Sequence, residues 1–144
     1  MPEKKTIERA KKDKAEGKAA TTQAGEFVRE EMEHIREGKH GARSPQQAIA
    51  IGLSKARRAG VDLPPPRKGT TSEATRKRAE RDLEKGHSSK PTKPSAKRSR
   101  AVLGALKREP RSAASKSALS KQAKQAAARR RVRGKTTASA KSGA

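Results

Sequence analysis

The residues best suited to chemistry in this sequence are positive charges that gather toward its C-terminal end. Residues 87–144 contain 17 Lys and Arg against one acid, Glu109, so this segment holds +16 of the total net charge of +23. Guanidinium groups bind phosphate oxygens through paired hydrogen bonds, and ammonium groups act as compact point charges. Because neutralised phosphates release condensed counterions, the segment predicts salt-dependent binding to a nucleic acid.

The densest group of charges is Arg129, Arg130, Arg131 and Arg133, and guanidinium groups can also enter a narrow minor groove. If about ten basic side chains engage at once, the logarithm of the binding constant falls with the logarithm of the salt concentration at a slope of about −9. We call this the logarithmic salt slope. An electrostatic term of this size would dominate every other contribution to binding that the sequence offers. A solubilising charge run is the alternative, although such runs usually mix both signs. The residues expected to contact phosphate are Lys97, Arg98, Arg100, Lys107, Arg108, Lys116, Lys121, Lys124, Arg129, Arg130, Arg131, Arg133 and Lys135.

Sequence-specific base reading and catalysis are not indicated by any motif. There is no zinc-finger spacing and no aromatic stacking pair, and Arg133-Gly134-Lys135 lacks the proline of a minor-groove hook. His34 and His40 could meet a cation, but two ligands six residues apart do not make a zinc site, so two exposed histidines are expected instead. We therefore predict no metal, no cofactor and no enzymatic activity.

The composition limits the scaffold that can hold these charges. Only 29% of the residues are hydrophobic, Phe27 is the one aromatic residue, and 37% are charged, so any core is small. The absence of cysteine excludes disulfides and thiolate ligands. No secretory leader and no run near the ~20 apolar residues of a membrane span are found, so a soluble, cytoplasmic, nucleoid-associated protein without a membrane partner is expected.

Helix signals in residues 22–62 predict a helical hairpin. Thr22 can cap its first helix and Gly38 can end it, whereas Ser44-Pro45-Gln46-Gln47 is a strong start for the second, which Gly60 would end. Gly52 would permit close approach of the two helices. The face expected to pack the helices together, or to form a homodimer, consists of Phe27, Val28, Met32, Ile35, Ile49, Leu53 and Ala56.

The rest of the chain is divided by proline, glycine and charge. Residues 1–21 should be a polar, marginally helical, solvent-facing segment, and the proline-rich residues 63–71 should be a stiff spacer that separates the hairpin from a short helix over 72–86. Residues 87–144 should be a basic low-complexity tail, extended at its start, with one helix capped by Ser99 and another over 113–131 that form fully on binding. The expected fold is mostly α: a small helical hairpin or three-helix N-terminal part with a long disordered basic C-terminal tail.

The run Gln47-Ala48-Ile49-Ala50-Ile51-Gly52-Leu53-Ser54 resembles a short domain of unknown function found in small basic bacterial proteins. The resemblance covers about residues 25–62. Related proteins are often described in general terms as DNA-binding proteins. The resemblance therefore implies DNA as the partner, but it gives neither a mechanism nor binding residues. Residues 87–144 are similar in composition to linker-histone tails and their bacterial counterparts.

These features together predict DNA binding without sequence specificity, by phosphate neutralisation, in a nucleoid-associated or histone-like architectural role. Phosphate chemistry alone does not separate DNA from RNA, so an RNA-associated or ribosome-associated protein is the first alternative. A protein-interaction module, in which the hairpin binds a partner and the tail only tethers, is the second.

Overall fold

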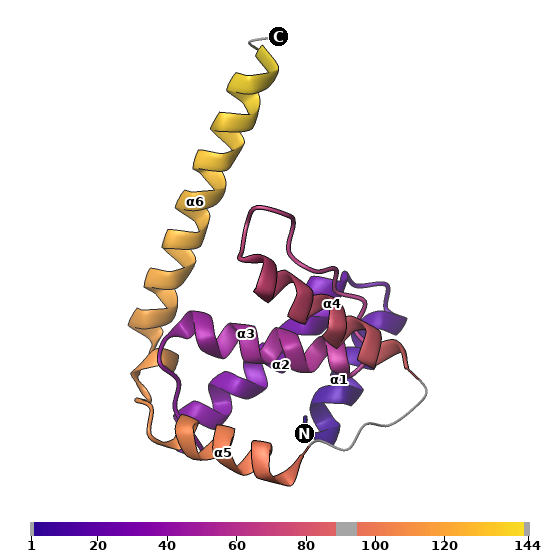
Figure 1. Cartoon of the computed structure of the whole chain (residues 1–144), viewed down its shortest axis with the longest axis vertical. Coiled ribbons are helices and arrows are strands. Elements are labelled where there is room, and N and C mark those ends of the chain that lie inside the picture. The colour runs from indigo at the N-terminus through magenta and orange to yellow at the C-terminus, as the bar shows by residue number, and fades with distance from the viewer. Residues whose placement is uncertain (1, 89–94, 143–144) are drawn as a thin grey trace.

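The computed structural model describes residues 2–88 and 95–142, with side chains as far as Gly134. Figure 1 shows two parts, a body made of residues 2–88 and a basic arm made of residues 95–142, whose last helix projects from the body as a straight rod. The predicted mostly α fold is confirmed. The elements are α1 (Lys4–Ala15), α2 (Ala20–Arg36), α3 (Pro45–Arg58), α4 (Glu73–His87), α5 (Ala96–Lys107), the 3-10 turn η1 (Ser112–Ala114) and α6 (Lys116–Ser142).

The helices α2 and α3 form the predicted hairpin. At the start of α3, the Ser44 hydroxyl accepts a hydrogen bond from the backbone N–H of Gln47 at 3.2 Å, while the Gln47 side chain accepts one from the N–H of Arg43 at 2.6 Å. Two backbone donors that the helix cannot satisfy itself are thereby paired. The local sequence signal for this helix start is therefore confirmed.

The ends of the hairpin helices are as predicted, except for the N-terminal end of α2. Gly38 and Gly60 follow α2 and α3 with φ of 79° and 101°, the left-handed conformation in which glycine commonly ends a helix. The prediction that Thr22 caps α2 is wrong. The helix begins earlier, at Ala20, with Ala19 as an N-cap that makes no side-chain hydrogen bond.

Gly52 lies where the two hairpin helices come closest. A Cβ atom at this position would lie 2.7 Å from the Cα of Val28 on α2, which is closer than carbon atoms can approach. Any side chain would therefore push the helices apart, and the predicted close approach at Gly52 is confirmed.

Two small hydrophobic clusters lie toward the two ends of the hairpin. The first cluster joins α1, α2, α3 and the chain after α3, and consists of Ala10, Ala24, Phe27, Ala56, Val61 and Leu63. The second cluster joins α2, α3 and a piece of the arm, and consists of Met32, Ile35, Ala42, Ala48, Ala113 and Ala114. All seven residues of the predicted packing face belong to these clusters or pack against them. Helix packing within one chain is confirmed, and a homodimer through this face stays a prediction.

The first helix, α1, is not the solvent-facing segment that its polarity predicts. Its Ala10 is buried in the first cluster. The Glu30 carboxylate of α2 accepts hydrogen bonds from the backbone N–H of Glu3 at 2.6 Å and from the Thr6 hydroxyl at 3.3 Å. Because the contact is largely polar, α1 lacks the apolar stripe by which a packed helix is recognised.

The proline-rich residues 63–71 do not hold the next helix away from the hairpin. The buried guanidinium of Arg57 donates to the carbonyl oxygens of Leu63 at 3.1 Å and Pro64 at 3.0 Å, so the segment is tied to the end of α3. Burial lowers the pKa of Arg57, because removal from water disfavours the charged form. The predicted separation of the hairpin from the following helix is therefore wrong.

The fourth helix, α4, folds back against α3. The Ser54 hydroxyl of α3 donates to the Asp82 carboxylate of α4 at 2.7 Å, and Ala79 is buried as expected. The helix continues to His87 instead of ending at Gly86. The body thus consists of four helices, with α1 packed on α2 and α4 packed on α3 of the hairpin.

The arm is helical in the regions where helices were predicted, but both helices start elsewhere. Ser95, not Ser99, caps α5 by accepting from the N–H of Arg98 at 3.4 Å. The second helix starts at Lys116 rather than at residue 113, because the preceding alanines form a 3-10 turn buried against the body. That the arm is disordered until an anion binds stays a prediction. The predicted extended start of the tail lies, from residue 89 to 94, outside the described residues.

Replacing Gly52 with Ala is expected to lower the free energy of unfolding by about 1–3 kcal/mol, because the added methyl group meets helix backbone that cannot move aside alone. Denaturation with urea measures this change. The control is Gly25→Ala in α2, where nothing lies within 4 Å of the added Cβ. That control should be neutral or gain up to about 1 kcal/mol from helix propensity, and an equal loss in both variants would contradict the close contact.

Candidate nucleic-acid interface

The helix α6 places a dense group of positive charges on a rod that leaves the body (Figure 1). Its 27 residues span about 40 Å. Successive residues of an α-helix are rotated by about 100° around its axis. Viewed down this axis, the described basic side chains of α6 surround the helix, and the widest sector without a basic side chain is about 80°. The predicted phosphate-binding residues that lie exposed on α6 are Lys116, Lys121, Lys124, Arg129, Arg130, Arg131 and Arg133.

The remaining predicted residues fall on or beside α5, with one exception. The exception is Lys135, which follows the last residue whose side chain the structure describes. The exposed residues of α5 and its C-terminal end are Lys97, Arg98, Arg100, Lys107 and Arg108. The structure therefore places the described members of the predicted set on or beside two helices.

The junction between α5 and α6 is bound to the loop that connects α2 and α3. The backbone N–H of Gly41 donates to the carbonyl oxygen of Leu106 at 2.8 Å, and the N–H of Ala42 donates to that of Pro110 at 3.0 Å. A Cβ at Gly41 would lie 2.0 Å from the carbonyl oxygen of Glu109. The two chain segments can meet only because residue 41 has no side chain.

Two arginines complete this junction at the C-terminal end of α2. Arg111 donates from Nε to the carbonyl oxygen of Ile35 at 3.3 Å and from Nη2 to that of Arg36. Arg36 in turn donates from Nε to the carbonyl oxygen of Ala114 at 2.9 Å. The last carbonyls of a helix lack partners and carry partial negative charge, which favours cationic donors there. The start of α6 is thereby fixed on the body.

Sequence reasoning missed the roles of Arg36 and Arg111. Arg111 lies among many basic residues, and its type gives no signal that it binds backbone carbonyls instead of phosphate. Arg36 belongs to a mixed-charge helix end that reads as solvent-exposed. The buried pair Ala113 and Ala114 carries only a weak hydrophobic signal, so the docking of this segment was not predicted.

A groove of about 400 Å³ lies between the starts of α3 and α6. Backbone N–H groups at helix N-termini favour anions, and hydroxyl groups add further donors. The groove combines these features with two cationic side chains from segments that are distant in sequence. Its polar lining residues are Arg43, Ser44, Ser112, Ser115, Ser117 and Lys121.

Several acidic residues of the body have local cationic partners. The pKa of Glu3 is lowered to about 2, mainly because the His34 ring donates a hydrogen bond to its carboxylate and Lys5 adds another. The pKa of Lys18 is raised by Glu16 and Asp13, and that of Lys39 by Glu37. These acids are thus paired with cations of the body.

The prediction of two exposed histidines is wrong. The His40 side chain is 8% exposed and that of His34 is 15% exposed. The loop after α2 turns back over that helix, because Gly41 and Ala42 are held by the arm. The sequence spacing of the two histidines does not reveal this return of the chain.

Comparison with known proteins places the similarity in the body. Among the described helices, none is both long enough and apolar enough to cross a membrane. No curated protein and no solved structure matches the chain. Residues 4–68 are similar to a family of unknown function (DUF6496), so the match includes α1, α2 and α3 and leaves the arm outside it.

Proposed function

We propose that this protein binds duplex DNA without sequence specificity, through its basic arm, in an architectural role such as that of a nucleoid-associated protein. One observation carries the proposal: α6 is a helix anchored at one end to the body, with exposed cations on all its sides. Such a helix has no apolar face with which to enter a membrane surface.

The distribution of charge around α6 suits a groove better than a flat surface. An α-helix with side chains is about 10–12 Å in diameter, and the major groove of B-DNA is about 12 Å wide. Inside that groove a helix has a phosphate backbone on each side, so cations all around it can contact phosphates. On a flat surface, the cations on the far side of the helix would remain in water.

The same geometry favours DNA over duplex RNA. The major groove of A-form RNA is deep and too narrow for side chains to read, whereas its minor groove is wide and shallow. A helix with charges on every side therefore gains more contacts on B-form DNA. RNA binding remains the competing outcome of the test below.

The body orients the arm in this proposal. Because Arg111, Gly41 and the second cluster fix the segment before α6, the helix leaves the body in one direction. The groove between α3 and α6 extends the cationic surface toward the body through Lys121. One phosphate of the duplex would lie in this groove when α6 is engaged.

A chain that ends at Ser120 tests the proposal without removing the docked segment. It keeps Ala113 and Ala114, which belong to the second cluster, and Leu119, which packs against it. It removes eight basic residues: Lys121, Lys124, Arg129, Arg130, Arg131, Arg133, Lys135 and Lys141. If each contacts a phosphate, the logarithmic salt slope of DNA binding falls by about seven units. Fluorescence anisotropy with a labelled duplex, titrated at several salt concentrations, measures the slope.

The comparison of nucleic acids belongs to the same experiment. We expect the full chain to bind random-sequence DNA duplexes with similar affinities, and to bind an RNA duplex of equal length more weakly. Equal affinity of the full and shortened chains would refute the role of α6. Tighter binding to RNA would refute the choice of DNA.

A further inference from the structure

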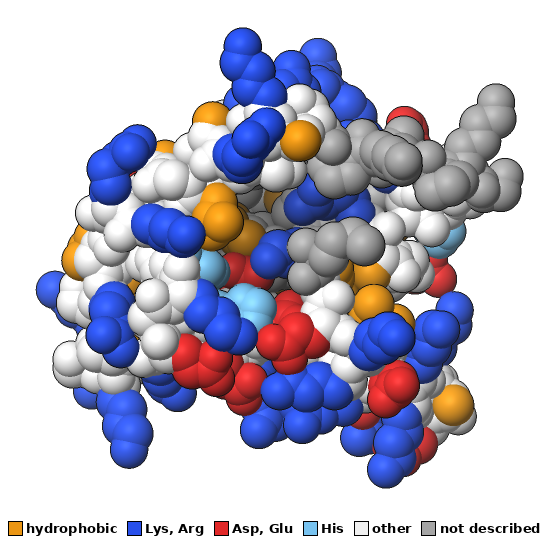
Figure 2. Space-filling view, turned by 90° about the horizontal axis from the view of Figure 1, so that it is seen from below, with side chains coloured by type: hydrophobic (Ala, Val, Ile, Leu, Met, Phe, Trp, Pro, Cys, Tyr) orange, Lys and Arg blue, Asp and Glu red, His pale blue; other side chains and the backbone are white. Residues whose placement is uncertain are grey.

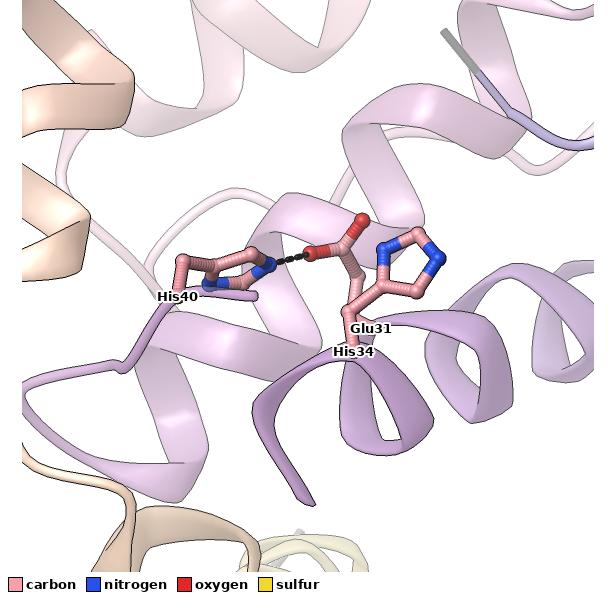
Figure 3. Close-up of side chains that lie close together, drawn as sticks. All are labelled: Glu31, His34 and His40. Atoms are coloured by element: carbon pink, nitrogen blue, oxygen red, sulfur yellow. Dashed lines mark ion pairs between the residues drawn. The ribbon is translucent and has the colours of Figure 1, made fainter. Parts of the chain in front are cut away.

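A group of metal-ligating side chains lies in the body, apart from the exposed cations of the arm. Glu31 and His34 come from one face of α2, and His40 comes from the loop that follows this helix. One ligand atom from each residue lies within 4.8 Å of the other two. Figure 3 shows the Glu31 carboxylate between the two histidine rings, and Figure 2 shows histidine and acidic side chains side by side in a hollow of the body.

The carboxylate of Glu31 is the centre of this group. Its side chain is 1% exposed, and its Oε2 is buried without a hydrogen-bond partner. This oxygen lies 3.2 Å from Nε2 of His40, an ion pair when that ring is protonated (dashed line in Figure 3), whereas Oε1 binds the ammonium group of Lys55. A buried carboxylate oxygen that receives no hydrogen bond is costly, and a bound cation would remove that cost.

Both histidines are oriented by acceptors on their outer sides. Nδ1 of His40 lies 2.8 Å from the carbonyl oxygen of Gly41, and Nε2 of His34 lies 3.1 Å from the Glu3 carboxylate. An acceptor at one ring nitrogen holds the proton there and leaves the lone pair on the other nitrogen. The nitrogens left as ligands are Nε2 of His40 and Nδ1 of His34, and Figure 3 shows a ring nitrogen of His34 facing Glu31.

We propose that Glu31, His34 and His40 bind one divalent transition-metal ion, and that Zn²⁺ fits this donor set best. Two imidazoles and one carboxylate, with a fourth position for water, form a familiar tetrahedral arrangement for zinc. Zinc–ligand bonds of roughly 2.0–2.1 Å place neighbouring donors about 3.3 Å apart. The 3.2 Å between His40 and Glu31 already matches this spacing, and a movement of the His34 ring toward them, from within 4.8 Å, would complete the set.

In a neighbouring group, made of Glu3, Glu30 and His34, one ligand atom from each residue also lies within 4.8 Å of the other two. Oε1 of Glu30 accepts from the backbone of Glu3 and from the Thr6 hydroxyl, and its Oε2, like that of Glu31, is buried without a hydrogen-bond partner. The site is nonetheless weaker, because its third ligand, Glu3, is partly exposed and is already paired with Lys5 and Lys39. Nε2 of His34 is also committed to Glu3 there. These contacts anchor α1 to α2 and orient His34 for the first group.

The proposed ion would connect α2 with the loop that holds the arm. Gly41 follows His40 directly, and its N–H binds the end of α5. Bound metal would therefore strengthen the junction between body and arm. Lys55 opposes the ion by charge, so the affinity is expected to be lower than in a site without a neighbouring ammonium group.

The test uses the full chain and Zn²⁺ alone, in isothermal titration calorimetry and thermal denaturation. We expect one ion per chain and a Tm that rises by several degrees at saturating Zn²⁺, since an ion that binds only the folded chain stabilises it. His34→Gln should weaken binding at least about 100-fold, because it removes a ligand and not merely an outer partner. His87→Gln, outside the group, is the matched control and should bind as the unaltered chain does.

A spectroscopic measurement separates ligation from folding. Co²⁺ in place of Zn²⁺ should give the intense visible absorption of a tetrahedral site in the full chain and in His87→Gln, but not in His34→Gln. Because His34 belongs to neither hydrophobic cluster, His34→Gln is expected to retain its helical circular dichroism. Absence of stoichiometric Zn²⁺ binding by the full chain, or equal binding by His34→Gln, would overturn the proposal.

Discussion

A chain in which Arg129, Arg130, Arg131 and Arg133 are replaced by Gln is expected to bind duplex DNA with a logarithmic salt slope about 3.6 units shallower than that of the unaltered chain. The value follows if each guanidinium neutralises one phosphate at about 0.9 units per contact. At physiological salt the same loss corresponds to a decrease in affinity on the order of a thousandfold. Glutamine preserves helix propensity, so α6 itself should persist.

The matched control removes the same number of charges from the body. Lys4, Lys11, Lys77 and Arg78 are exposed residues of α1 and α4, and their replacement by Gln leaves the same net charge as the α6 variant. If location decides, this control changes the slope by less than about one unit. Equal slopes in the two variants would mean that binding depends on net charge alone, and α6 would lose its assigned role.

The hairpin could be predicted from sequence because its signals are local. Ser44, Pro45 and Gln47 specify a helix start within four consecutive residues, and Gly60 specifies the end. The apolar residues from Phe27 to Ile35 recur at helical spacing, so they define one buried face. Each of these patterns specifies its own helix. The loop between the two helices is short, so it favours their packing as antiparallel neighbours.

The docking of the arm could not be predicted because its signals are neither local nor apolar. The segment is held by Ala113 and Ala114, which give small hydrophobic contacts, and by hydrogen bonds from Arg111 to backbone carbonyls. Side-chain type does not reveal such bonds. The same docking brings His40 back over α2, so the ligand group with Glu31 could not be assembled from residue spacing either.

Replacement of Gly41 with Val should detach the arm from the body and lower the free energy of unfolding by about 3 kcal/mol. An added Cβ would lie 2.0 Å from the carbonyl oxygen of Glu109, and backbone atoms on both sides prevent a simple side-chain adjustment. Separation would also break the hydrogen bond from Gly41 to Leu106 and uncover the second cluster. Urea denaturation measures the loss in stability.

A double-mutant cycle attributes this loss to the arm. In a chain that ends at Gly86, residue 109 is absent, so Gly41→Val should cost less than about 0.5 kcal/mol relative to that shorter chain. A full penalty in the shorter chain would place the strain within the loop and contradict the docking. In the full chain the exposed cations of α6 remain, so Gly41→Val should lower the salt slope of DNA binding by no more than about one unit, the groove contact, while its stability falls. Body and arm would then be separable: docking determines where α6 points, and charge determines how strongly it binds.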